Sequence, residues 1–277
     1  MIQGFFMRFP NGCGKALTLS YDDGVRQDIR LIDIMSKNGL KGTFNLNSGR
    51  LSVNDVPGKS YLTNSEAAKL YTGSGNEVAL HGMEHCFWSD VSAAAAMYDI
   101  AADKHNLEKL TGMPVRGGAY PFGTFNDAAV KILELSDIKY CRTIISSCSF
   151  DIPTDWLRLK PTCHHNDSRL SELTERFLNT SPDRIPYLFY LWGHSYEFDN
   201  DNNWGLIEDF AEKVGGRDDI WYATNIEIYD YIQAFHSLIF ASDGSFAVNP
   251  TVTDVWLYDY RCGKTVKIAA NSRIAFE

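Results

Sequence analysis

Apolar positions follow two alternating patterns along the first 240 residues. Short apolar runs typical of strands, such as ALTLSY (16–21) and KGTFNL (41–46), flank a stretch whose apolar residues recur every three or four positions. That stretch places Ile29, Ile32 and Met35 on one face of a helix and stops at Gly39. The beginning of the chain therefore predicts a β-α-β unit with parallel strands.

The same alternation continues to about residue 240. Further strands are predicted at 76–81, 117–123, 139–144, 186–192 and 219–224, and further helices at 65–71, 92–112, 126–136, 168–180, 204–216 and 225–238. About seven strand–helix units favour a barrel over an open doubly wound sheet.

The last part of the chain has a different pattern. Residues 246–260 and 265–270 have β-type composition and flank a Cys262–Gly263 turn, which predicts a β-hairpin. We therefore divide the chain into an α/β barrel over residues 1–240 and a small β extension over 241–277.

Composition excludes several classes of protein. The 277 residues are 44% hydrophobic and 13% aromatic, which is enough for one large α/β domain. A net charge of -9 argues against a nucleic-acid partner, because binding phosphates requires clustered Lys and Arg. No apolar run reaches membrane-span length and no signal peptide is visible, so we expect a cytoplasmic protein without a membrane partner. The six cysteines include no CxxC pair, which predicts free thiols. Oligomeric state is left open.

Two adjacent carboxylates follow the first predicted strand. Function in parallel α/β folds lies at the carboxyl ends of strands, and Asp22 and Asp23 lie at such an end. Neighbouring carboxylates repel each other unless a cation lies beside them, and Gly24 permits the turn that would bring both into one cavity. The alternative is that Asp23 caps the following helix.

Histidines follow two later strands. His81 and His85 are four residues apart, which would place both imidazoles on one side of a helical turn, a spacing that recurs in zinc sites. One added carboxylate gives a set of ligands that leaves positions for water and substrate. His194 ends the apolar run LFYLWGH.

These motifs, in this order, resemble the polysaccharide deacetylases of carbohydrate esterase family 4 over roughly residues 16–235. The resemblance implies a distorted (β/α)7-type barrel that removes acetyl groups from sugars. It assigns Asp22 as general base and His194 as general acid. It also implies that Asp23, His81 and His85 hold a divalent metal ion.

The third motif of that family departs from its pattern in this chain. In AYPFG the resemblance implies that Phe122 offers a backbone N–H to the oxyanion. Tyr120 is one of the aromatic residues near the strand ends that we expect to stack on sugar rings, with packing as the alternative. Ala119 lies where the family has an arginine that orients the base. The arginine could come from elsewhere, and the alternatives are Arg116, Arg142 and Arg158.

The fourth motif is expected within DIPTDWLRLKP. There the resemblance gives Asp155 as the acid that supports His194, and Trp156 as a contact for the acetyl methyl group. Nearby His164 and His165 are either plain loop histidines or functional ones.

The expected function is metal-dependent hydrolysis of N-acetylated or O-acetylated sugars or oligosaccharides. Zn²⁺ suits the ligand set, and Co²⁺, Ni²⁺, Mn²⁺ or Fe²⁺ would also be accepted. The alternatives are a noncatalytic sugar-binding relative, favoured by Ala119, and an amidohydrolase acting on a non-sugar amide. A structural or interaction protein would leave the polar residues at the strand ends unexplained.

Overall fold

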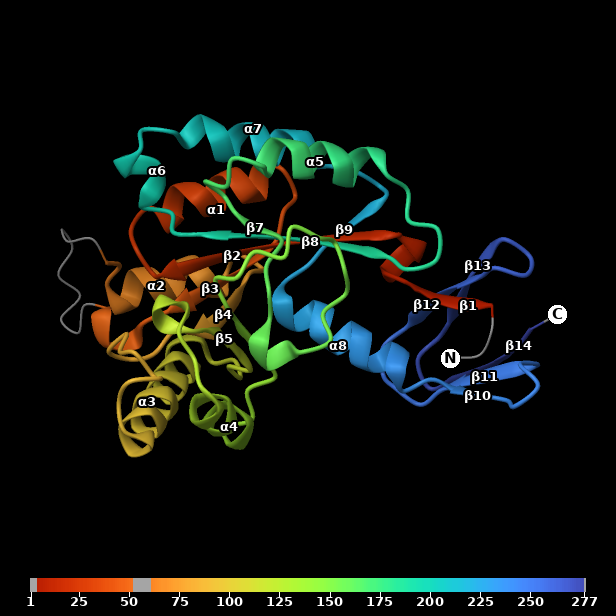
Figure 1. The fold of residues 1–277 in the computed structure, drawn as a ribbon, viewed down its shortest axis with the longest axis horizontal. Coiled ribbons are helices and arrows are strands. Elements are labelled where there is room, and N and C mark those ends of the chain that lie inside the picture. Colours follow the sequence, from red (N-terminus) through yellow and green to blue (C-terminus); the bar gives the residue numbers. More distant parts are fainter. Residues whose placement is uncertain (1–3, 52–60, 277) are drawn as a thin grey trace.

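A parallel sheet forms the centre of the molecule, and the computed structural model describes residues 4–51 and 61–276 (Figure 1). The strand order is β6-β5-β4-β3-β2-β8-β7, and β9 also pairs with β2. The strands are β2 (Lys15–Asp23), β3 (Gly42–Leu46), β4 (Glu77–Leu80), β5 (Gly117–Ala119), β6 (Tyr140–Arg142), β7 (Cys163–His164), β8 (Tyr187–Gly193) and β9 (Ile220–Tyr222). The predicted parallel α/β architecture is confirmed.

Helices cover the outside of this sheet. They are α1 (Asp28–Lys37), α2 (Asn64–Thr72), α3 (Ala93–Thr111), α4 (Asp127–Leu135), α5 (Leu170–Asn179), α6 (Glu197–Asn200), α7 (Trp204–Val214) and α8 (Asn225–His236). Helices α1, α5 and α7 pack together on one side, and α2, α3 and α4 on another (Figure 1). Capping boxes at Thr63 and Thr224 start α2 and α8. Ile29, which the periodicity placed on the buried face of α1, is 45% exposed, and Asp28 is buried instead.

One irregular segment connects the two edges of the curled sheet. Leu159 forms a parallel bridge to Arg142 in β6, and a few residues later β7 pairs with β8. Residues 159–164 therefore run from β6 to β8 and connect the two edges of the curled sheet, as in a barrel. The sequence did not predict β7 because only two residues pair there, and the segment lacks a periodic pattern.

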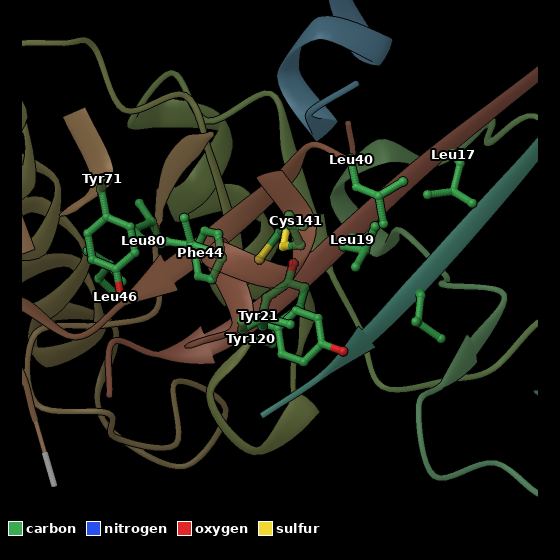
Figure 2. Packing of buried hydrophobic residues seen from close by; sticks show 14 of the residues in the cluster. Leu17, Leu19, Tyr21, Leu40, Phe44, Leu46, Tyr71, Leu80, Tyr120 and Cys141 are labelled. Carbon is green, nitrogen blue, oxygen red and sulfur yellow. The ribbon is translucent and has the colours of Figure 1, made fainter. Parts of the chain in front are cut away.

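The two faces of β2 have different chemistry although all nine residues are buried. Leu17, Leu19 and Tyr21 belong to the apolar core under the helices, as Figure 2 shows. The alternate residues point into the barrel. There the Asn45 amide donates hydrogen bonds to Ser20 Oγ at 2.9 Å and to Asp22 Oδ1 at 2.8 Å. The barrel interior is therefore polar and leads toward Asp22.

The first turn of α8 covers the amino ends of the strands. The Asn225 side-chain amide donates to Tyr190 Oη at 2.7 Å, and the Ile226 N–H donates to Glu77 Oε2 at 2.9 Å. Glu77 is the first residue of β4, whereas His81 follows its last residue. A site at the carboxyl ends is consequently at the opposite end of the barrel from α8.

Two small antiparallel sheets form the C-terminal extension. One contains β1 (Phe5–Arg8), β12 (Val255–Asp259) and β13 (Lys264–Ile268), and the other contains β10 (Ile239–Phe240), β11 (Phe246–Asn249) and β14 (Ser272–Ala275). The predicted hairpin about Cys262–Gly263 is the β12–β13 pair. The extension begins before residue 241 and also takes in residues 5–8 from the other end of the chain. Local periodicity carries no information about such long-range pairing.

Along the described ranges, no helix is both long enough and apolar enough to cross a membrane. All six cysteine thiols are free.

Candidate active site

The turn after β2 brings Asp22 and Asp23 to the same group of side chains. Asp23 has a φ of 81° and Gly24 a φ of 69°. The turn of the backbone therefore begins at Asp23, one residue before the glycine that predicted it. His81 Nε2 lies 3.8 Å from Asp22 Oδ2 and 3.7 Å from Asp23 Oδ1. Because α1 starts at Asp28 with Gln27 as its N-cap, Asp23 does not cap that helix.

His81 and His85 converge without a helical turn, so that part of the prediction is wrong. They lie in a loop after β4, where Gly82 has a φ of 80° and His85 a φ of 54°. The two Nε2 atoms are 3.2 Å apart. The Asn47 side-chain amide donates to the carbonyl oxygens of His81 and Gly82, both at 2.7 Å, and so fixes the loop.

Two buried aspartates of α3 also hold this loop, and the sequence analysis missed both. Asp103 accepts the His81 N–H at 3.0 Å, and Asp99 accepts the Glu84 N–H at 2.8 Å. Burial raises the pKa of Asp103 to about 7, against the hydrogen bonds that lower it. The signal available in the sequence was their spacing, since carboxylates four residues apart share one face of a helix.

Asp23, His81 and His85 form an arrangement that fits a divalent cation. Asp23 Oδ1 lies 3.7 Å from His81 Nε2 and 3.6 Å from His85 Nε2. His81 donates its Nδ1 proton to the Ala119 carbonyl oxygen at 2.9 Å, which leaves the Nε2 lone pair directed at Asp23. Asp23 Oδ1 is buried and has no hydrogen-bond partner in the described part of the chain. A cation would satisfy this oxygen and both nitrogens.

His85 is neutral in this arrangement. Burial, together with the neighbouring His81, lowers the pKa of His85 to about 4, although Asp23 opposes the shift. A neutral imidazole is the form that binds metal ions.

Asp22 is held ionised by Arg142. Burial acts to raise the pKa of Asp22, but the paired Arg142 guanidinium, with His81 and His194, outweighs burial and lowers the pKa to about 2. Arg142 is only 1% exposed, and its guanidinium lies 4.2 Å from the centre of the Trp192 ring. The buried carboxylate is therefore ionised at neutral pH.

Arg142 is the arginine that reaches Asp22, although position 119, where the family has an arginine, is an alanine. Ala119 and Arg142 are direct partners across β5 and β6, so the arginine occupies the neighbouring strand at the same level. The other two candidates have different partners: Arg116 pairs with Asp230, and Arg158 pairs with Asp127 and Asp155.

His194 lies on the other side of Asp22 and has Glu197 as its carboxylate partner. Its Nε2 is 3.9 Å from Asp22 Oδ2, and its Nδ1 is 3.2 Å from Glu197 Oε1. Burial lowers the pKa of His194, but the Glu197 hydrogen bond and the charge of Asp22 prevail, so the pKa is raised. The sequence analysis missed Glu197, whose signal was its position three residues after His194 in HSYE.

The structure corrects the expectation for Asp155. Its side chain accepts the Arg158 N–H at 3.1 Å at the start of the 3-10 turn Trp156–Arg158, and it pairs with the Arg158 guanidinium. Because Asp155 is engaged by Arg158, it does not support His194.

Trp156 and Tyr120 are packing residues in this structure. Trp156 packs edge-on against Tyr229 of α8, with ring centres 5.1 Å apart, so it lies toward the amino ends of the strands. Tyr120 is 1% exposed, and its hydroxyl donates to the Leu157 carbonyl oxygen at 2.7 Å. The sequence analysis had placed both against the substrate.

His164 and His165 join His194 around Glu197, and we call these four residues the Glu197 cluster. The Nε2 atoms of His164 and His165 lie 3.2 and 3.0 Å from Glu197 Oε2. His165 is fully buried and stacks on Tyr21 and Phe198. The two histidines are therefore part of the site's surroundings rather than plain loop residues.

Phe122 lies beside His85. It sits in the 3-10 turn Pro121–Gly123 with a φ of 57°, and its ring centre is 4.3 Å from that of His85. Its ring is stacked on Phe87, which the sequence analysis did not identify, at 3.8 Å.

Comparisons with known proteins bear on the family and the fold. The polysaccharide deacetylase family model matches residues 10–141. A Mycobacterium smegmatis protein that carries the name of a polysaccharide deacetylase has a TM-score of 0.59 at 15% identity, covering 83% of this chain and 94% of its own. A comparison with curated proteins finds no match.

Two further solved structures share the fold. The family 4 domain of a multidomain xylanase from the hindgut metagenome of Trinervitermes trinervoides has a TM-score of 0.51 at 16% identity, covering 79% of this chain and 92% of that chain. A family 4 pseudoenzyme from Bacillus anthracis has a TM-score of 0.50 at 18% identity, covering 81% of this chain and 68% of that chain. These likenesses confirm the barrel fold, and the family model agrees with the resemblance identified from the motifs.

Proposed function

From the relationship of this chain to the polysaccharide deacetylases of carbohydrate esterase family 4, we propose that it is a metal-dependent hydrolase that removes acetyl groups from sugars. The observation that carries the proposal is the buried Asp23 Oδ1, which has no hydrogen-bond donor among the described residues and faces two imidazole nitrogens. A divalent ion bound there, with zinc the best match to the ligands, would lower the pKa of a bound water and polarise the acetyl carbonyl.

Asp22 is the proposed general base. Arg142 and Asn45 each hold one of its oxygens, which fixes the carboxylate and leaves it ionised. It takes the proton of the attacking water, for which it is ionised and held in a fixed position. Arg142 would thus do what the family arginine does, from β6 in place of β5.

His194 is the proposed general acid, and Glu197 positions it. Since Nδ1 faces Glu197, Nε2 is the atom that gives its proton to the departing nitrogen or oxygen of the sugar. The Phe122 backbone N–H is the proposed oxyanion donor. Ala119 was the feature that favoured a noncatalytic relative, and the ion pair of Arg142 with Asp22 supports the catalytic alternative.

Acetate release tests the proposal. The purified protein is assayed on N-acetylglucosamine oligomers, acetylated xylan and small acetylated sugars, with chelator and after adding Zn²⁺ back. We expect activity on one of these classes that chelator removes and metal restores. Asp22→Asn should keep the metal and lose roughly 10²- to 10⁴-fold in kcat. Activity that chelator leaves intact would contradict the metal assignment, and full activity in Asp22→Asn would contradict the base.

A further inference from the structure

Asp28 is a buried carboxyl group in the apolar stripe of α1. Its side chain is fully buried, and Leu31 and Met35 lie on the same buried face of the helix. Among the described residues, no lysine, arginine or histidine forms an ion pair with it. Burial raises the pKa of Asp28 to about 7, although hydrogen bonds to its oxygens lower it. A polar group kept at this cost in an apolar position needs a reason other than packing.

Two hydroxyl groups from distant parts of the chain hold this carboxyl. Ser195 Oγ donates to Asp28 Oδ1 at 2.5 Å, and Tyr71 Oη of α2 donates to Asp28 Oδ2 at 2.6 Å. Both donor residues are buried as well. Water does not compete with hydrogen bonds between buried groups, so these bonds fix the positions of the segments they join. Asp28 therefore connects α1, α2 and the turn after β8.

Ser195 lies within the turn that carries His194 and Glu197. The Glu197 N–H donates to the His194 carbonyl oxygen at 3.1 Å, and the Phe198 N–H donates to the Ser195 carbonyl oxygen at 3.3 Å. The bond from Ser195 to Asp28 thus holds the backbone from which both His194 and its carboxylate partner extend. The imidazole of His194 is partly exposed, so its position depends on this backbone and on Glu197.

Asp28 also belongs to the segment that carries Asp22 and Asp23. It follows Asp23 by five positions, and its own N–H donates to the Val25 carbonyl oxygen at 3.1 Å as α1 begins. One buried carboxyl therefore links the turn after β2 to the turn after β8, which lies 167 residues further along the chain. Asp22 and His194 face each other across this link, with 3.9 Å between Oδ2 and Nε2.

We propose that Asp28 is a positioning residue that acts through Ser195 to hold His194 at its distance from Asp22. This inference rests on the proposed function, in which these two side chains are the acid and the base. A displacement of about 1 Å in a reacting group costs on the order of 10²-fold in rate. An anchor that keeps the two turns together therefore has a direct effect on turnover.

Removal of the Ser195 hydroxyl tests this inference. Ser195→Ala deletes the bond to Asp28 and leaves every charged side chain of the site in place. We expect kcat for acetate release to fall roughly tenfold, with KM and metal content unchanged. Asp28→Leu keeps the branched shape without an acceptor and should lower kcat at least as much. Asp28→Asn should recover most of the activity, because an amide can accept from Ser195 and donate to Tyr71 Oη.

Tyr71→Phe provides the matched control. It removes the other hydroxyl from the same carboxyl, on the oxygen that does not face Ser195. The free energy of unfolding should therefore fall about as much as in Ser195→Ala, while kcat changes by about twofold or less. Equal losses of kcat in the two variants would overturn the inference, since activity would then follow stability alone. An unchanged kcat in Ser195→Ala would also overturn it.

Hydrogen exchange separates this inference from the proposed function. The exchange rates of the Glu197 and Phe198 amides, measured by NMR, report on the turn without any turnover. Faster exchange of both amides in Ser195→Ala and Asp28→Leu, but not in Tyr71→Phe, supports the anchoring role even if no acetate release is found. Rates that Ser195→Ala leaves unchanged overturn it even if deacetylation is observed. Absence of acetate release from the unaltered protein counts against the proposed function alone.

Discussion

Two clusters at the carboxyl end of the barrel each place one carboxylate among histidine side chains. Asp23 lies 3.6 to 3.7 Å from the nitrogens of His81 and His85. In the Glu197 cluster, the carboxylate lies 3.0 to 3.2 Å from the nitrogens of His164, His165 and His194. By residue type and distance alone, either cluster could hold a metal ion.

The hydrogen bonds on the far side of each imidazole distinguish the two clusters. His81 donates its Nδ1 proton to Ala119, so its Nε2 offers a lone pair. His164 Nδ1 instead accepts the Asn166 N–H at 3.1 Å, so its proton is on Nε2 and faces Glu197. In the first cluster His81 presents a lone pair toward Asp23, whereas in the second His164 presents a proton to Glu197.

The ionisation of Glu197 agrees with this difference. Burial acts to raise its pKa, but the three histidines outweigh burial and hold the pKa well below its usual range. An ionised Glu197 already surrounded by imidazoles needs no metal ion. Distances between possible ligands are therefore insufficient to identify a metal site, and the proton positions decide.

The largest expected effect comes from the metal ligands. His81→Ala combined with His85→Ala should remove the bound metal and lower kcat/KM by on the order of 10³-fold or more, because the lone pairs that bind the cation are lost. Metal content by atomic emission and acetate release are the measurements. His164→Asn is the matched variant in the other cluster and should retain one metal per chain. If His164→Asn lost metal instead, or if the double variant kept it, the contrast would be refuted.

A substitution of Arg142 tests whether its ion pair with Asp22 supports activity. Arg142→Gln removes the cation that keeps Asp22 ionised, so we expect kcat to fall roughly 10- to 100-fold while metal content stays the same. Combining it with Ala119→Arg returns an arginine to the paired position on β5 and should recover part of the activity. An Arg142→Gln variant with unchanged kcat would show that Asp22 does not depend on this ion pair.

The smallest effect is expected for a substitution of Glu197, and it should appear as a shift in the pH profile of kcat/KM. Glu197 helps raise the pKa of His194, so the protonated acid persists to higher pH than an ordinary histidine. Glu197→Gln lowers that pKa, and the alkaline limb of kcat/KM should move to lower pH by roughly one unit. Metal content is expected to stay the same, which separates this effect from damage to Asp23, His81 and His85. An alkaline limb that does not move would exclude Glu197 as the partner that matters.

Much of the site could be predicted from short segments. Asp22 and Asp23 follow an apolar run, and His81 and His85 follow another, so parallel strands must bring these pairs to the same edge. The positions of β2, β4 and β8 and of the helices between them were also visible, because burial of one face leaves a local period in the sequence.

The other partners could not be read from the sequence because they depend on contacts across the barrel. Arg142 reaches Asp22 from a strand 120 residues away in the chain. Glu197 takes the position expected for Asp155 because the turn after β8 folds back on His194, while Arg158 engages Asp155.

The sequence by itself determined the alternation of strands and helices and the residues that end the strands, since both follow from local burial. Only the tertiary structure decided which arginine meets Asp22 and which carboxylate meets His194. It also decided which histidines offer a lone pair and which offer a proton. The physical reason is that ionisation and proton position depend on neighbours in space, and these come from distant parts of the chain.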